Sequence, residues 1–80
     1  MKGHPELIVG KTISGVIIKQ GGSGSPSRQL FLLFDDNTYF EFWSWGDYSG
    51  MSAAGGLDRG GAEEVRNYMK GNEIIFEKLA

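Results

Sequence analysis

The chain has 80 residues, which is enough for one domain with a small core and too few for two. It contains no cysteine and one histidine, which excludes disulfides and thiolate metal sites and gives little support for a transition-metal site. Eight basic and ten acidic residues give a net charge of −2, which argues against binding to the phosphates of nucleic acids.

The sequence also lacks the features of an exported or membrane-inserted protein. It shows no secretory leader and no apolar run of the ~18 residues that are needed to span a bilayer. We therefore expect a cytoplasmic protein that has no membrane partner, and no motif in the chain points to a cofactor.

The first 20 residues predict a short helical turn followed by a strand. A proline at the first position and a glycine after the last predict one helical turn over residues 5–9, with an entry strand as the alternative. Residues 11–20, KTISGVIIKQ, are rich in β-branched side chains, which favour a strand. Gly15 within this run predicts a bulge or the close approach of another backbone. The glycine- and serine-rich residues 21–27 predict the connection to the next strand.

Residues 29–45, QLFLLFDDNTYFEFWSW, predict a β-hairpin around which the rest of the chain is organised. Two runs of large apolar side chains flank Asp-Asp-Asn, and Asn37 suits the left-handed position that ends such a turn. This turn places Phe31 opposite Glu41. One face of the hairpin is then entirely apolar: Leu30, Leu32, Phe34, Phe40 and Phe42. The second face carries Phe31, Leu33, Tyr39, Glu41 and Trp43.

The remaining residues predict a long loop, a helix and a last strand. Residues 46–60 show no clear periodicity, so we expect a loop whose length suggests a functional role. Residues 61–70 place apolar side chains at helical spacing, with Asp58 as the expected N-cap and Gly71 as the left-handed end. Residues 73–79, EIIFEKL, predict a strand.

Together these elements predict a single α+β domain over residues 1–80. We expect a small, mainly antiparallel sheet of about four strands in the chain order β-β-β-α-β, with one helix packed on one face. The first three strands are expected to form a meander. The edge at which the last strand pairs stays open.

Aromatic and acidic side chains gather near the start of the predicted loop. The aromatic residues are Tyr39, Trp43, Trp45 and Tyr48, and the acids are Glu41, Asp47 and Asp58. Aromatic rings beside carboxylates suit a cationic or aromatic ligand. The alternative is that these rings, together with Phe31, cap the core or fill a dimer interface.

Glu41 and the segment before the helix each leave two interpretations open. Glu41 lies within a strand among aromatic residues, so it either points to solvent, which we favour, or is a partly buried acid with a shifted pKa. Arg59 and the free backbone N–H groups at the start of the helix suggest an anion site. The simpler interpretation is that Asp58 caps the helix and that Arg59 is solvated or paired locally.

No pattern in the sequence predicts catalysis or metal binding. His4 lies at the N-terminus, and no serine has a histidine placed to activate it. The Asp-Asp-Asn turn is explained by turn chemistry rather than by a cation. We therefore expect a protein that is not an enzyme, with a carboxylate-based hydrolase that uses Glu41 and Asp58 as the alternative.

Two stretches of the chain resemble a known group of proteins. They are LFLLFDDNTYFEF at residues 30–42 and SGMSAAGGLDRGGAEEVRNY at residues 49–68. Both are similar to stretches of small uncharacterised bacterial proteins, including products carried on mobile gene cassettes. The resemblance implies no activity for this chain, because such families have none assigned.

The expected architecture suggests a role in self-association. One helix covers only part of one face of a sheet whose two faces are both apolar, so the second hairpin face needs another cover. We expect a non-catalytic module that forms a homo-oligomer, with a dimer favoured, or that binds another protein. The alternative is a pocket for a small cationic or aromatic molecule under residues 46–60.

Overall fold

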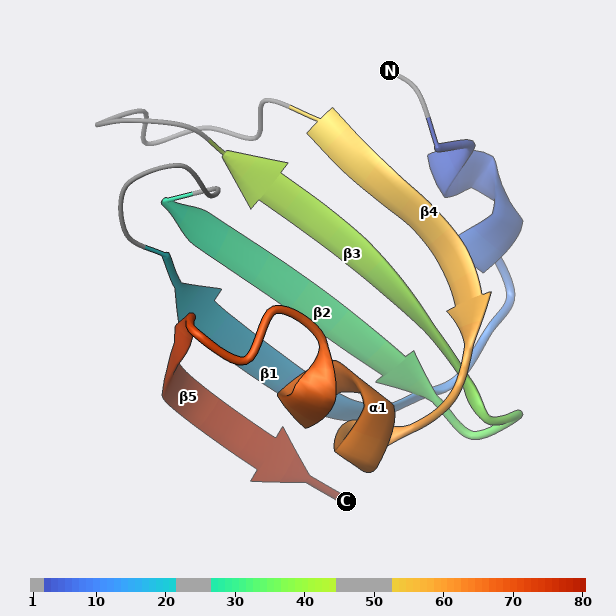
Figure 1. Ribbon diagram of the computed structural model, residues 1–80. Helices are drawn as coiled ribbons and strands as arrows, with labels where there is room; N and C mark the ends of the chain where they lie inside the picture. The colour runs from blue at the N-terminus through green and yellow to red at the C-terminus, as the bar shows by residue number, and fades with distance from the viewer. Residues whose placement is uncertain (1–2, 22–26, 45–52) are drawn as a thin grey trace.

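The computed structural model describes residues 3–21, 27–44 and 53–80 (Figure 1). It has an α+β fold with a five-stranded antiparallel sheet in the order β4-β3-β2-β1-β5. The elements are the 3-10 helix η1 (Pro5–Ile8), β1 (Ile13–Gln20), β2 (Arg28–Phe34), β3 (Thr38–Ser44), β4 (Ala53–Arg59), α1 (Ala62–Asn67) and β5 (Glu73–Leu79). Neither helix in this described part of the chain has the length and apolar character needed to cross a membrane.

Strands β2 and β3 form the hairpin that the sequence predicts. Phe31 lies opposite Glu41, which is the expected register. Asn37 adopts the left-handed conformation with a φ of 62°. Its carbonyl accepts a hydrogen bond from the N–H of Gly60 at 2.8 Å, so the turn is tied to the segment that leads into α1.

The helical turn and the bulge predicted for the first 20 residues are also confirmed. η1 begins at Pro5, and Gly10 follows it with a φ of 86°. In β1 the register shifts between Ile13 and Gly15. A Cβ atom on Gly15 would lie 2.8 Å from Cδ2 of Leu79, so the glycine lets β5 pack closely against β1.

The sheet has five strands rather than the predicted four, because β4 lies within the segment expected to be a loop. Its sequence, AAGGLDR, has no β-branched or aromatic residue, so it gives no strand signal. Its pairing with β3 contains a bulge, in which Gly56 lies opposite Glu41 and Ala54 lies opposite Phe42. Gly56 has a φ of 106°, a value that glycine adopts without strain.

The helix α1 is shorter than predicted and begins differently. It spans six residues, and its N-cap is Gly61. Asp58 was the expected N-cap, but it lies within β4 and does not cap the helix. The carboxylate of Glu64 accepts a hydrogen bond from the N–H of Gly61 at 2.6 Å, which is one half of a capping box.

The end of α1 differs from the prediction as well. Tyr68 is the C-cap residue, and Met69 follows it with a φ of 50°. Met69 therefore takes the left-handed position that was predicted for Gly71. Carbonyls at and just beyond this end of the helix accept hydrogen bonds from Lys19 of the sheet, as described below.

Strand β5 pairs with β1, so it lies at the opposite edge of the sheet from β4, and α1 connects the two edge strands across one face (Figure 1). The register shifts between Ile18 and Lys19, so that Phe76 lies opposite Ile18 and Ile74 lies opposite Lys19. Because directly opposite residues share a face, Ile74 and Phe76 lie on different faces of the sheet.

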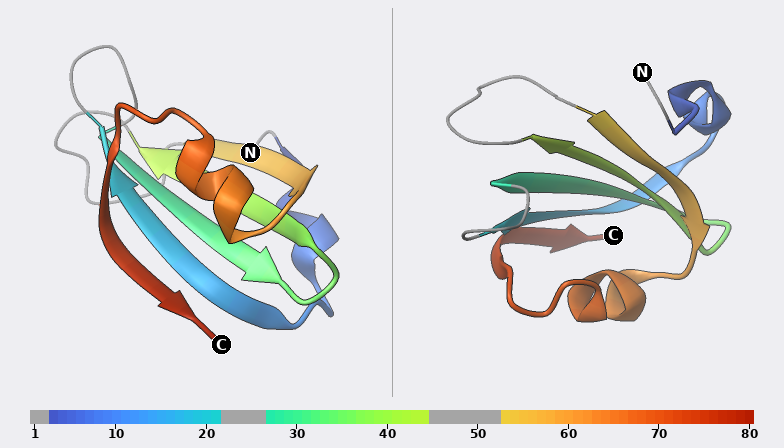
Figure 2. Two further views of the ribbon diagram at one scale, coloured as in Figure 1. Left: turned by 60° about the horizontal axis from the view of Figure 1, so that its bottom comes forward. Right: turned by 45° about the horizontal axis from the view of Figure 1, so that its top comes forward.

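The helices α1 and η1 lie on opposite faces of the sheet (Figure 2). The face under α1, called the helix face below, has a core of Ile17, Phe31, Leu33 and Val65. The other face, called the open face, has a core of Phe34 and Phe40, against which Ile8 of η1 packs. The helix therefore covers the hairpin face that contains Phe31 and Glu41, which was expected to need a partner.

Candidate functional site

The structure divides the predicted site residues between the two faces of the sheet. Register places Phe31, Tyr39, Glu41, Trp43 and Asp58 on the helix face. Arg59 lies opposite Thr38 and alternates with Asp58 along β4, so these two side chains point to opposite faces. Arg59 therefore points to the open face, away from α1, which does not support an anion site that combines Arg59 with the start of the helix. Trp45, Asp47 and Tyr48 lie outside the described residues.

Glu41 is buried rather than exposed, with 8 % of its surface accessible. The unpredicted strand β4 makes β3 an interior strand, and a Cβ atom on Gly55 would lie 2.5 Å from Oε1 of Glu41. The carboxylate thus lies directly against the backbone of β4. Burial raises the pKa of Glu41, and the negative charge of Asp58 adds to this, while a hydrogen bond from Gln29 and the charge of Lys19 oppose it.

A chain of buried amides connects Glu41 to the segment after α1. Nε2 of Gln29 donates to Oε2 of Glu41 at 2.6 Å. Nδ2 of Asn72 donates to Oε1 of Gln29 at 2.6 Å, and Sδ of Met69 lies 3.5 Å from Nε2 of the same glutamine. The chain therefore links β3, through β2, to the connection between α1 and β5.

Lys19 contributes a buried cation from β1. Its ammonium donates to the carbonyls of Val65 at 3.2 Å and Met69 at 3.4 Å, and to that of Tyr68. These carbonyls lie at and just beyond the C-terminal end of α1, where a positive charge suits the helix dipole. Burial lowers the pKa of Lys19, and the charge of Glu41 opposes this. All three donors of the ammonium are used, which does not favour a role as a nucleophile.

The motifs of the sequence did not point to Lys19, Gln29 and Asn72. The sequence does contain a signal for Lys19 and Gln29. Alternate residues of a strand share a face, so Lys19 lies on the same face as Ile17, and Gln29 on the same face as Phe31. A polar residue at a position that alternation assigns to the core indicates a buried network. Asn72 has no comparable signal, because it lies between α1 and β5.

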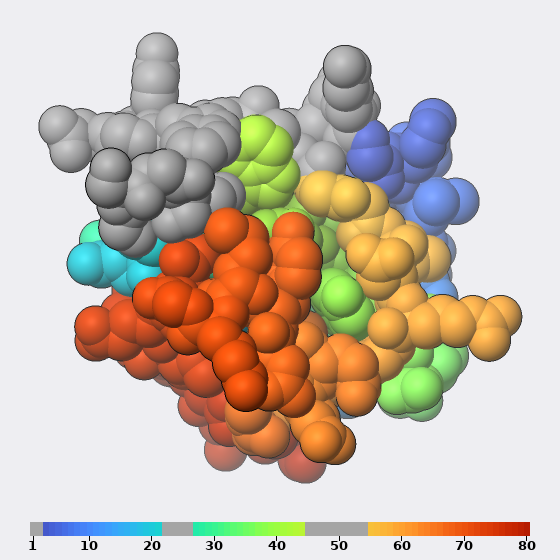
Figure 3. Space-filling view, in the orientation of Figure 1, coloured from blue at the N-terminus to red at the C-terminus, as the bar shows by residue number. Residues whose placement is uncertain are grey.

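Aromatic rings line the helix face beside this polar network. The ring of Phe31 lies 6.0 Å from that of Tyr39 and 6.1 Å from that of Tyr68, measured between centroids. Asp58 lies opposite Tyr39. Burial raises the pKa of Tyr39, and the negative charge of Asp58 raises it further. Atoms of β3 reach the surface between α1 and β4 (Figure 3). The structure thus brings Tyr39, Glu41 and Asp58 together and adds Tyr68 to them.

The open face, in contrast, carries apolar residues across the middle of the sheet. Two neighbouring rows of opposite residues cross it: Leu57, Phe40, Leu32 and Val16, and then Phe42, Leu30, Ile18 and Phe76. Phe76 is 49 % exposed, and Ile13, which lies opposite Phe34, is 54 % exposed. Phe34 and Phe40 are buried, so the apolar surface that this face exposes lies mainly toward β1 and β5.

Among the described residues, η1 is the element that packs on the open face. It contacts β4, and Ile8 packs against the cluster of Phe34 and Phe40 (Figure 2). Its four residues therefore cover the side of the open face that is nearer to β4. η1 does not cover the side of the open face that is formed by β2, β1 and β5.

Both edge strands of the sheet carry a bulge. The register shift in β4 leaves Gly55 without an opposite residue, and the shift in β5 does the same for Ile75. Bulges interrupt the row of backbone groups that another strand would use, which protects a sheet from edge-to-edge pairing. The exposed apolar residues of β5 are therefore better suited to contacts through side chains than to strand addition.

Within residues 3–21, 27–44 and 53–80, no group of three or more histidine or acidic side chains is arranged to hold a metal ion. No protein-family model, no curated protein and no solved structure matches the chain. The chemistry of the two faces is therefore the basis for assigning a function.

Proposed function

We propose that this chain is a non-catalytic module that self-associates as a dimer through the open face of its sheet. The observation that carries the proposal is the pair of apolar rows that cross this face, together with the exposure of Phe76 at their end. The surface differs from the one expected from sequence, because Phe31 and its face are already covered by α1. One helix still serves a sheet with two apolar faces.

Burial of this surface supplies the free energy of association. Complete burial of one large apolar side chain is worth about 1.5–3 kcal/mol, and contiguous apolar patches on small domains mark contact sites. Because η1 occupies the β4 side of the open face, the proposed contact is centred on β1 and β5, with Ile18 and Phe76 at its middle.

The charges of β5 favour a second copy of the chain as the partner. Register places Glu73 opposite Gln20 and Lys78 opposite Val16, so both charges lie on the open face, on either side of Phe76. A two-fold axis that stacks β5 on β5 in the antiparallel direction brings Lys78 of each copy over Glu73 of the other. Such an isologous contact is self-complementary in both shape and charge.

The proposal is tested by the molar mass in solution, measured by light scattering on a sizing column over a hundredfold range of concentration. We expect a dimer for the unaltered chain. Phe76→Ser removes the central contact from both copies, so its dissociation constant should rise at least tenfold. Ile74→Ser is the matched control, because Ile74 is an exposed apolar residue of the same strand on the helix face.

A monomer at the highest concentration would overturn the proposal. An equal rise in the dissociation constant of the dimer for Phe76→Ser and Ile74→Ser would also overturn it, because the contact would then not be specific to the open face. Circular dichroism of both variants establishes that the fold is retained.

A cationic small molecule remains the second candidate ligand, and one observation favours it. Tyr39, Tyr68, Glu41 and Asp58 lie together on the helix face, where aromatic rings and carboxylates suit an organic cation. Titration with benzyltrimethylammonium, followed by NMR, tests this idea. Saturable shifts at Tyr39 that disappear in Asp58→Asn would support it, and shifts of equal size in that variant would argue against it.

A further inference from the structure

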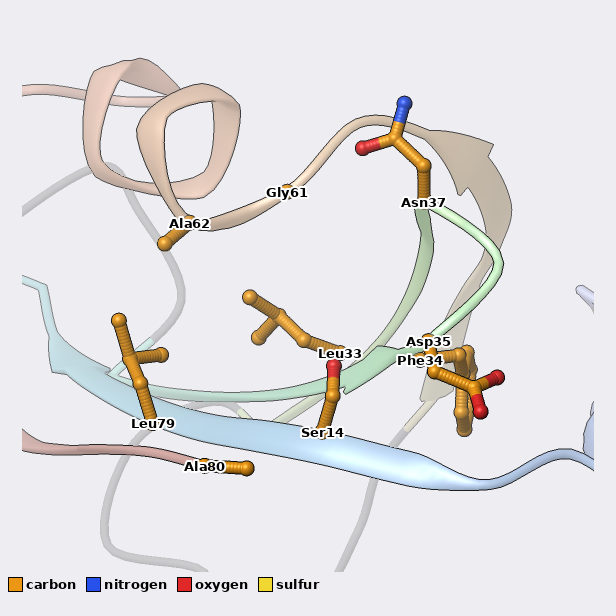
Figure 4. Close-up of a pocket in the computed structure, with 9 residues that line it drawn as sticks. All are labelled: Ser14, Leu33, Phe34, Asp35, Asn37, Gly61, Ala62, Leu79 and Ala80. Carbon is orange, nitrogen blue, oxygen red and sulfur yellow. The ribbon is translucent and has the colours of Figure 1, made fainter.

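A slot opens between the start of α1 and the helix face of the sheet, with a volume of about 360 Å³ (Figure 4). Its lining includes Ser14, Leu33, Asn37, Gly61, Ala62 and Leu79. The volume lies at the small end of the ~300–1,000 Å³ that ligand sites occupy. The slot lies on the opposite side of the sheet from the proposed dimer contact.

The slot stays open because its roof is built from residues with almost no side chain. Gly61 has none, and the side chain of Ala62 is a single methyl group that points down toward the sheet (Figure 4). The wall formed by Leu79 depends on Gly15, because a Cβ atom there would lie 2.8 Å from Cδ2 of Leu79. Small residues on both layers thus leave a gap where larger residues would have closed the core.

The floor of the slot is apolar, with one hydroxyl group at its side. The side chains of Leu33 and Leu79 rise from the sheet toward the roof, and the hydroxyl of Ser14 points the same way (Figure 4). The N–H of Ala80 donates to the carbonyl of Ser14 at 2.8 Å, which fixes this part of the wall. The arrangement pairs an apolar body with one hydrogen-bonding position, which is the usual composition of a small-molecule site.

The charged side chains around the slot do not favour an anion. None of its lining residues is basic, and Asp35 is the acidic residue among them. An anionic ligand would therefore lose its hydration without gaining a cationic partner. An uncharged ligand avoids this cost, because Ser14 both donates and accepts a hydrogen bond.

We propose that this slot binds a small uncharged molecule that places an apolar chain between Leu33, Leu79 and Ala62 and a hydroxyl or amide group against Ser14. The probe is hexan-1-ol, titrated into isotope-labelled protein and followed by NMR of backbone amides and methyl groups. We expect saturable shifts confined to the residues that line the slot. Hexanoate, which has the same chain length and a negative charge, should bind at least tenfold more weakly.

Two variants distinguish binding in the slot from adsorption to apolar surface. Ala62→Leu fills the slot, so the dissociation constant for hexan-1-ol should rise at least tenfold, while Glu63→Leu adds the same side chain to an exposed position of α1 and should leave it unchanged. Ser14→Ala should weaken binding about three- to tenfold through the lost hydrogen bond.

The absence of saturable shifts, or shifts that persist unaltered in Ala62→Leu, would overturn the proposal. Shifts centred on Ile18 and Phe76 would overturn it as well, because they would place the alcohol on the open face. The test does not depend on self-association: Phe76→Ser should bind hexan-1-ol with unchanged affinity, even if the dimer proposal fails.

Discussion

The helix face buries Lys19, Gln29 and Glu41 beneath the end of α1, whereas the open face, which η1 covers in part, consists of apolar rows. The better-covered face is therefore the more polar one. Polar groups are tolerated there because the last carbonyls of α1 and the side chain of Asn72 supply their hydrogen-bond partners. The open face lacks such partners and instead presents the kind of surface that a second molecule covers.

The largest effect is expected from Lys19→Met, which keeps most of the volume and removes the charge. The carbonyls at the end of α1 lose their donor and Glu41 loses the nearby cation, so the free energy of unfolding should fall by about 3 kcal/mol or more. Urea unfolding at fixed protein concentration measures this loss. Lys70→Met, at an exposed lysine after α1 that lies outside the proposed dimer contact, is the control and should stay within about 0.5 kcal/mol.

A smaller loss is expected from Gly55→Ala, because the new Cβ atom would lie 2.5 Å from Oε1 of Glu41. Such a contact forces the carboxylate out of place, at a cost of about 1–3 kcal/mol in unfolding free energy. Gly71→Ala is the matched control, since nothing lies within 4 Å of a Cβ atom there. The cost of Gly55→Ala should shrink in a Glu41→Ala background, and full additivity of the two changes would contradict this explanation.

The smallest effect concerns the charge of Glu41 and depends on pH. Its folded-state pKa is raised above 4.5, so the cost of burying the ionised form is present above the folded pKa and is relieved as the pH falls through it. The gain in unfolding free energy from Glu41→Gln, relative to the unaltered chain, should therefore be largest at neutral pH. That advantage should decline toward pH 4.5, and an advantage that grows as the pH falls would show that the sign is wrong.

The parts of the fold that local chemistry determines were predictable from sequence. The hairpin register follows from Asn37 and from the alternation of large side chains, and η1 follows from Pro5 and Gly10. The bulge in β1 was predicted from Gly15 alone. In each case a residue with a restricted or unusually free backbone lies at the position that decides the structure.

The parts that tertiary contacts determine were not predictable. β4 has no strand propensity, and β3 holds it in the sheet through backbone pairing. Without β4 the burial of Glu41 could not be inferred, so the solvent-facing interpretation of this residue was wrong. The end of α1 was misplaced as well, and there Lys19, distant in sequence, binds carbonyls at and beyond the end of the helix.

The pairing of β1 with β5 has a consequence for the kinetics of folding. β1 joins β2 through nearby residues, but its other neighbour comes from the far end of the chain, with Gly15 opposite Leu79. Local hairpins close quickly, whereas such a distant pair must first overcome the entropy of closing almost the whole chain into a loop. The four-stranded meander of β1 to β4 is thus expected to fold first. The docking of α1 and β5, completed by the hydrogen bonds from Lys19, is expected to be the slow step.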